Sequence, residues 1–128
     1  MEKDMQTYFL WLASIMSVIT FCVHTFVGGP RVAAPLLADK TLPIASKWLN
    51  YYCWHITTLY TFIMGGAYAY VALFPDKVEL IVFLCVLNFS FSILSFIVAL
   101  KAKINPFRFP STSLFFLVAS SGLASLLV

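Results

Sequence analysis

Four long stretches of this chain carry almost no charge, and they set the class of structure that it can form. A transmembrane helix needs about 20 consecutive, mostly apolar residues. Four helices of this kind are expected, at approximately residues 7–28, 42–74, 79–100 and 111–128. The chain is 62% hydrophobic and 10% charged, whereas a soluble domain is about 25% charged. The sequence therefore predicts a single all-α domain, a polytopic membrane protein built as a bundle of four transmembrane helices.

The same composition limits the partners. Few of the 128 residues lie outside the apolar segments, so neither a separate soluble domain nor a nucleic-acid-binding surface is expected. The lipid bilayer is the main surrounding of such a chain. Four short helices enclose little interior volume, which favours a homo-oligomer.

The basic residues predict the orientation, because cytoplasmic loops carry an excess of Lys and Arg. Lys3 and Lys77 lie on the side of the N-terminus and of the second inter-helix loop. The other six basic residues lie in the first and third loops: Arg31, Lys40, Lys47, Lys101, Lys103 and Arg108. We therefore predict a protein of the cell inner membrane with both termini on the outer, periplasmic side.

The connections between the helices carry turn signals. Pro75 and Asp76 end the second helix in a tight turn, so the second and third helices are expected to be antiparallel neighbours. The Gly-Gly-Pro sequence at 28–30 is expected to end the first helix, and the apolar "RVAAPLL" that follows should lie along the membrane surface. Thr41 and Ser111 are expected to cap the second and fourth helices.

The two histidines of the chain lie in apolar surroundings, in "FCVHTFVGGPR" and "NYYCWHITTLY". His24 lies about one turn before the expected end of the first helix, and His55 lies about one turn inside the second. Because these helices run in opposite directions, both histidines are expected at one depth near the cytoplasmic face. Ionisable residues inside a membrane are costly and usually functional. We therefore predict that His24 and His55 share one site.

Polar side chains at spacings of three and four mark one face of three helices. Hydrocarbon cannot satisfy polar groups, so these faces should point into the bundle. The predicted ligand-binding residues are Thr58, Asn88, Ser92 and Ser95 on these faces and Arg31 at the mouth of the site. Arg31 also fits an ordinary basic loop residue. The faces contain Ser17, Thr20 and His24; His55, Thr58 and Thr61; and Cys85, Asn88, Ser92 and Ser95.

Several functions fit this pattern. His24 and His55 are the predicted catalytic residues if the protein is a membrane enzyme, and the predicted metal ligands if haem or a metal is bound. Haem needs only one axial histidine and an apolar slot. A small hydrophobic or polar ligand could instead be held by hydrogen bonds to the imidazoles. The alternatives are a small transporter or channel with the polar faces as its path, and an accessory subunit whose histidines only pack.

The pattern "H…GGPRVAAPLL…YCWHITT" spans the first two helices and the loop between them. It resembles small uncharacterised bacterial inner-membrane proteins with four helices. The resemblance implies the four-helix membrane architecture and no particular activity.

Overall fold

The computed structural model describes residues 2–128, and every regular element in that range is a helix. The first is α1 (Glu2–Cys22), which continues without a break through the π-helical segment η1 (Val23–Ala33) into α2 (Ala34–Ala38). The others are α3 (Ile44–Leu73), α4 (Val78–Lys101), the short 3-10 helix η2 (Pro106–Arg108) and α5 (Pro110–Ala124).

Three helices among the described residues are long and apolar enough to cross a membrane. They cover Lys3–Ala38, Ile44–Leu73 and Val78–Lys101. The fourth apolar helix, Pro110–Ala124, is shorter. The prediction of an all-helical chain with long apolar helices is therefore confirmed.

The first helix extends past the Gly-Gly-Pro sequence, so the prediction that it ends there is wrong. Proline lacks an N–H group and its ring crowds the carbonyl four residues earlier. Here Pro30 lies inside the π-helical segment, where hydrogen bonds span five residues and the turn is wider. None of the described glycines has a positive φ, so Gly28 and Gly29 continue the helix. The "RVAAPLL" segment is consequently helical and does not form a surface loop.

The turn between α2 and α3 is organised by Asp39. Its Oδ1 atom accepts hydrogen bonds from Thr41 N at 2.6 Å, Thr41 Oγ1 at 2.7 Å and Leu42 N at 3.2 Å. These bonds hold the pKa of the exposed Asp39 carboxyl below its ordinary value. Thr41 therefore serves the turn and does not cap α3, which begins after Pro43 without a side-chain cap.

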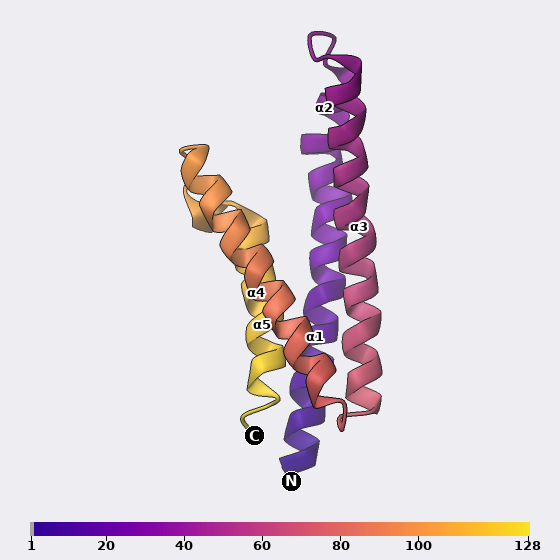
Figure 1. Ribbon diagram of the computed structural model, residues 1–128, viewed down its shortest axis with the longest axis vertical. Coiled ribbons are helices and arrows are strands. Elements are labelled where there is room, and N and C mark those ends of the chain that lie inside the picture. The colour runs from indigo at the N-terminus through magenta and orange to yellow at the C-terminus, as the bar shows by residue number, and fades with distance from the viewer. Residues whose placement is uncertain (1) are drawn as a thin grey trace.

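The four long helices form two hairpins that diverge like the arms of a V (Figure 1). One arm is α1, η1 and α2 packed against α3, and the other is α4 packed against α5. The arms meet where α1 also packs on α5, near both chain termini. As predicted, α3 and α4 run in opposite directions. However, α3 packs mainly against α1, and α4 packs mainly against α5. The prediction that α3 and α4 pack as neighbours is therefore only partly right.

The core lies where the arms meet. Its buried side chains come from all four long helices and include Leu10, Tyr68, Ile81, Leu84 and Val118. Small residues let the helices approach closely: Ser14 Oγ donates a 2.8 Å hydrogen bond to the carbonyl of Gly65. A β-carbon at Gly122 would lie 2.7 Å from Tyr68 Oη and 2.8 Å from Cys85 Sγ. Such close approach through glycine is typical of membrane helix packing.

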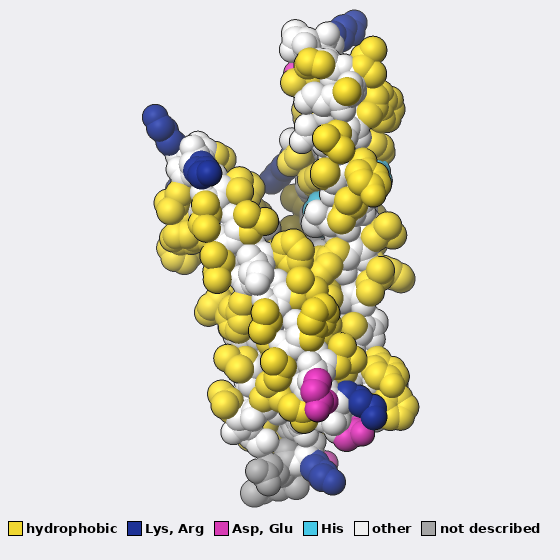
Figure 2. Space-filling model, in the orientation of Figure 1, with side chains coloured by type: hydrophobic (Ala, Val, Ile, Leu, Met, Phe, Trp, Pro, Cys, Tyr) yellow, Lys and Arg dark blue, Asp and Glu magenta, His cyan; other side chains and the backbone are white. Residues whose placement is uncertain are grey.

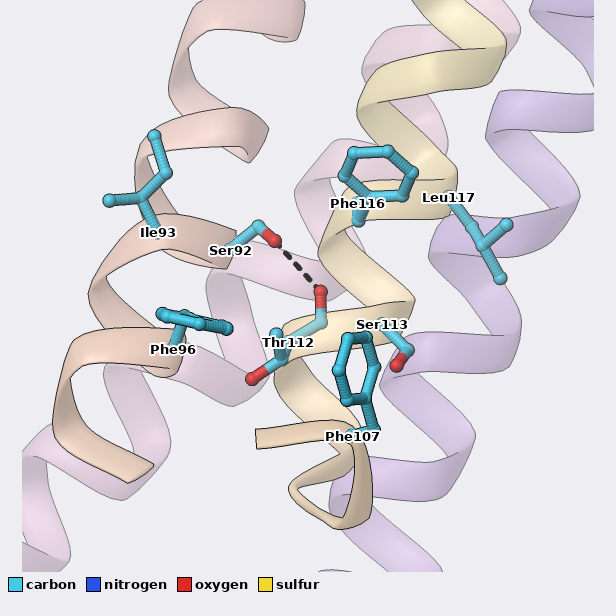
Figure 3. Close-up of a pocket in the computed structure, with 8 residues that line it drawn as sticks. All are labelled: Ser92, Ile93, Phe96, Phe107, Thr112, Ser113, Phe116 and Leu117. Atoms are coloured by element: carbon cyan, nitrogen blue, oxygen red, sulfur yellow. Dashed lines mark hydrogen bonds between the residues drawn. The ribbon is translucent and has the colours of Figure 1, made fainter. Parts of the chain in front are cut away.

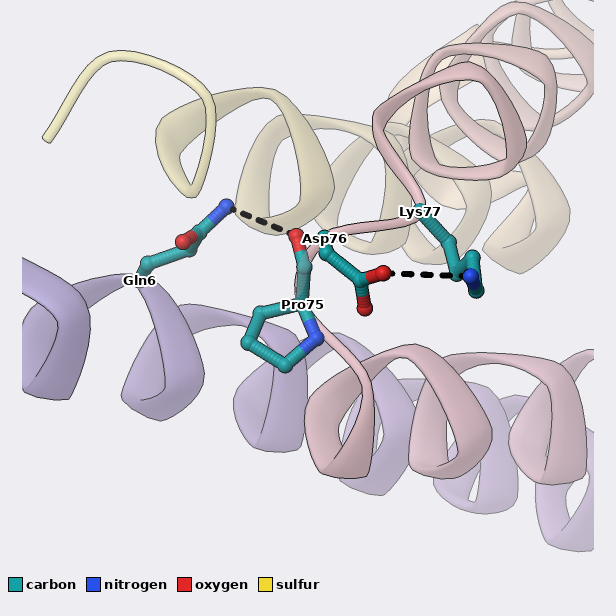
Figure 4. Close-up of polar contacts among 4 residues, drawn as sticks. All are labelled: Gln6, Pro75, Asp76 and Lys77. Carbon is teal, nitrogen blue, oxygen red and sulfur yellow. Dashed lines mark hydrogen bonds and ion pairs between the residues drawn. The ribbon is translucent and has the colours of Figure 1, made fainter.

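The α3–α4 turn closes the joined end of the V. Gln6 Nε2 of α1 donates a 3.4 Å hydrogen bond to the carbonyl of Pro75, and Asp76 pairs with Lys77 at 3.1 Å (Figure 4). The Lys77 ammonium keeps the pKa of the Asp76 carboxyl below its ordinary value. The predicted stop of α3 before this turn is confirmed, because the helix ends at Leu73.

Charge is divided between the two ends of the molecule. Most acidic side chains gather at the joined end together with some basic ones, and other basic side chains lie at the tips of both arms (Figure 2). The surface between them is largely hydrophobic. This distribution agrees with the division of basic residues on which the predicted orientation rests.

Candidate functional site

A cavity of about 540 Å³ lies between the two arms of the V, on the side of the basic tips. One wall is formed by η1, α2 and α3, and the other by α4 and α5. Most of its lining is apolar, with polar groups from His24, Tyr60, Ser95 and Ser111 among others. We refer to this cavity as the cleft.

An aromatic cluster forms the inner part of the cleft. The ring centroid of Tyr60 on α3 lies 4.6 Å from that of Phe91 on α4 and 6.0 Å from that of Phe115 on α5. The Phe91 and Phe115 centroids are 5.6 Å apart. These three rings fill the space between the arms where the arms begin to separate. The Tyr60 hydroxyl is buried and has no hydrogen-bond partner among the described residues, although buried hydroxyls normally have one.

His24 lies on the wall that η1, α2 and α3 form, and one of its ring nitrogens is hydrogen-bonded. Its Nε2 atom is 3.2 Å from the carbonyl oxygen of Trp54 and 3.1 Å from Thr58 Oγ1. A carbonyl can only accept, and the Thr58 hydroxyl already donates to the same carbonyl at 3.1 Å. Nε2 therefore carries the proton and donates to both oxygens. In the neutral imidazole this leaves Nδ1 as the acceptor.

The indole of Trp54 fixes the plane of the His24 ring. The two rings stack with centroids 3.9 Å apart and planes 21° from parallel. Gly28 makes room for the indole, since a β-carbon at this position would lie 2.6 Å from Trp54 Cη2. His24 and Gly28, four residues apart on η1, thus both contact the same ring.

Hydroxyl groups join α4 to α5 along the other wall. Ser95 Oγ lies 2.6 Å from Ser111 Oγ and 2.8 Å from Thr112 Oγ1. Ser92 Oγ donates a 2.8 Å hydrogen bond to the carbonyl of Thr112 (Figure 3). Ser111 is therefore a partner of Ser95 and not the cap of α5, which has no side-chain cap.

Some of the predicted site residues lie at the cleft, and others lie away from it. His24 and Ser95 line the cleft, and Thr58 holds His24. Ser92, Ser95 and Asn88 are buried, as predicted. Asn88 donates to the Leu84 carbonyl at 2.8 Å and to Met64 Sδ at 3.4 Å, away from the cleft. Arg31 is exposed and is not part of the lining.

His55 does not lie on the buried face of α3. It is exposed, and its ring meets Tyr51 edge-on with centroids 4.5 Å apart. The prediction that His55 belongs to the inward face with Thr58 and Thr61 is wrong, because Trp54 occupies that face one residue earlier. A site shared by His24 and His55 stays a prediction.

Trp54 and Tyr60 line the cleft although they were not predicted as site residues, and Ser111 lines it although it was predicted only as a helix cap. Trp54 is the start of a series at alternating spacings of four and three, which continues through Thr58, Thr61, Gly65, Tyr68 and Ala72. That spacing indicates one helix face, and would have placed Trp54 inward and His55 beside it.

A second cavity, of about 400 Å³, lies between α4 and α5 near η2 (Figure 3). Its lining includes Ile93, Phe96, Phe107, Phe116 and Leu117, with the Ser92–Thr112 hydrogen bond at its base. The surroundings are apolar and the polar groups at the base are already bonded to each other. Apart from the hydroxyl of Ser113, this cavity therefore has an apolar lining.

Comparison of the chain with protein-family models, with curated proteins and with solved structures found no match. Among the described residues, no cluster of three or more His, Cys, Asp or Glu side chains could hold a metal ion.

Proposed function

We propose that this protein is a four-helix bundle of the cell inner membrane that binds an amphiphilic small molecule in the cleft at His24. The observation that carries the proposal is a mostly apolar cavity of about 540 Å³ that is lined by the imidazole of His24 and by the hydroxyl-bearing residues Ser95 and Ser111. Small-molecule sites are typically concave and mostly apolar, with a few polar groups that orient the ligand. The cleft has this composition.

The polar groups suggest how such a ligand is held. Nδ1 of His24 can accept a hydrogen bond, and the Ser95–Ser111 pair offers hydroxyls. The apolar walls would receive a hydrocarbon portion, whose burial contributes about 0.8 kcal/mol per methylene group. The ligand class that fits is a molecule with one hydrogen-bonding head and an apolar tail.

Haem fits these residues less well. The Nε2 atom of His24 would have to leave the Trp54 carbonyl and Thr58 before it could ligate iron. A ligand that is hydrogen-bonded to Nδ1 requires no such change.

Trp54 provides an intrinsic probe of the cleft. In a protein with Trp11→Phe and Trp48→Phe, Trp54 is the only tryptophan. We expect a brominated fatty alcohol, an amphiphile with a neutral head, to quench its fluorescence in a saturable manner. Val98→Phe should weaken this binding by about tenfold, since small changes of pocket volume cost about 1–3 kcal/mol. Quenching titrations in detergent micelles measure the effect.

Two controls match this experiment. Val86→Phe makes the same change on an exposed part of α4 outside the cleft and should leave the titration unchanged. His24→Leu should weaken binding, whereas His55→Leu should not if His24 alone serves the cleft. Equal losses for both histidine variants would instead support the shared histidine site. Quenching that never saturates would contradict a binding site.

The proposed orientation is tested separately. Because six of the eight basic residues lie at the arm tips, we propose that the tips are cytoplasmic and that both termini are periplasmic. Reporter enzymes that are active only outside the cytoplasm should be active when fused to either terminus. Activity of a cytoplasmic reporter at the C-terminus would reverse the orientation.

A further inference from the structure

Two arginines directly precede residues that line the cleft, one on each arm of the V. Arg31 directly precedes Val32 of η1, and Arg108 of η2 directly precedes Phe109. Val32 and Phe109 both line the cleft. Both arginines are exposed, and in the part of the chain that the structure describes neither forms an ion pair.

The other basic residues of the tips are placed differently. Lys47 is already engaged, since its Nζ atom donates to the carbonyl oxygens of Leu37 and Asp39. Lys40 lies in the α2–α3 turn, Lys101 ends α4 and Lys103 follows it. No residue directly before or after these three lysines lines the cleft. The carboxylate of this end, Asp39, is bonded within its own turn. Arg31 and Arg108 are thus the two basic residues of this end that directly precede lining residues of the cleft, one on each arm.

We propose that the amphiphile bound in the cleft is an anionic membrane phospholipid, with its phosphate between Arg31 and Arg108 and an acyl chain against the apolar walls. This inference rests on the proposed function and adds the charge of the head group. Arginine matches phosphate geometry with two parallel hydrogen bonds. Two arginines on separate arms can contact one phosphate from both sides, which would also join the arms.

The single-tryptophan protein tests the head group directly. It is placed in bilayers of phosphatidylcholine that contain either brominated phosphatidylglycerol or brominated phosphatidylcholine at the same mole fraction. We expect the anionic lipid to quench Trp54 at a several-fold lower mole fraction. Arg31→Gln and Arg108→Gln should each reduce this preference by about fivefold, the effect of one basic group near anionic lipid.

The matched control removes two other cations from the same arms. Lys40→Gln with Lys103→Gln should keep the preference, and an equal loss in this variant would overturn the inference in favour of general attraction to the membrane surface. Equal quenching by both lipids would also overturn it, while leaving the proposed function intact. If neither lipid quenches Trp54 more than it quenches the exposed Trp48 in a protein with only that tryptophan, the proposed function itself fails.

Discussion

Replacing Gly122 with valine is expected to lower the free energy of unfolding by about 3 kcal/mol, because overpacking a filled core costs about 1–3 kcal/mol and sometimes more. Even the first added carbon would lie 2.7 Å from Tyr68 Oη and 2.8 Å from Cys85 Sγ. Tyr68 and Cys85 are buried, so neither can move aside without disturbing α3 or α4. Thermal unfolding in detergent, followed by circular dichroism, measures the loss.

Gly66 is the matched control for this substitution. A β-carbon there would meet nothing within 4 Å, and the residue is exposed on α3. Gly66→Val should therefore change stability by no more than about 0.5 kcal/mol. Equal destabilisation of both variants would mean that valine disturbs the helices themselves and that the contact at Gly122 is not responsible.

Gly28→Ala is expected to displace the indole that fixes His24. The new carbon would lie 2.6 Å from Trp54 Cη2 and 3.2 Å from Cζ2, so the ring must shift out of its stack with His24. We expect a changed Trp54 emission maximum in the single-tryptophan protein and weaker binding of the brominated fatty alcohol. The contact should also outweigh the gain of up to about 1 kcal/mol that alanine normally brings to a helix.

A substitution at the neighbouring Gly29 separates the collision with Trp54 from the stability that alanine adds to a helix. A β-carbon at Gly29 would meet nothing within 4 Å, so Gly29→Ala should keep the helical gain without the collision. We expect the two variants to differ in unfolding free energy by about 2 kcal/mol, with Gly29→Ala the more stable. An unchanged Trp54 emission in Gly28→Ala would contradict the assigned contact.

Much of the helical structure could be predicted because long uncharged runs leave few alternatives to helices. The bounds of α3, α4 and the start of α5 lie within two residues of the prediction. The buried face of α4 was also predicted, since Cys85, Asn88, Ser92 and Ser95 fall on one stripe. These features depend on local spacing, which the sequence carries directly.

The course of the first helix, the inward face of α3 and the packing of the helices depend on contacts between residues far apart in the sequence. Local sequence patterns do not describe such contacts. Gly-Gly-Pro ordinarily favours a helix end, but the wider π turn accommodates Pro30. The inward face of α3 is set by Trp54, which finds room over Gly28 of another helix. His55 is one residue away, about 100° around the helix, and it is exposed whereas His24 lines the cleft. Which helix packs against which is likewise decided by small residues such as Gly65 and Gly122.

The unequal lengths of the two arms have a consequence for the surrounding lipid. With 15 residues, α5 spans about 22 Å, whereas α3, with 30 residues, spans about 45 Å. A hydrocarbon core of about 30 Å is too thick for the first and too thin for the second. Bilayers respond to such mismatch by local thinning or by helix tilt. Lipid beside α5 would be compressed while lipid beside α3 would not, so the protein would impose a gradient of bilayer thickness from one flank to the other.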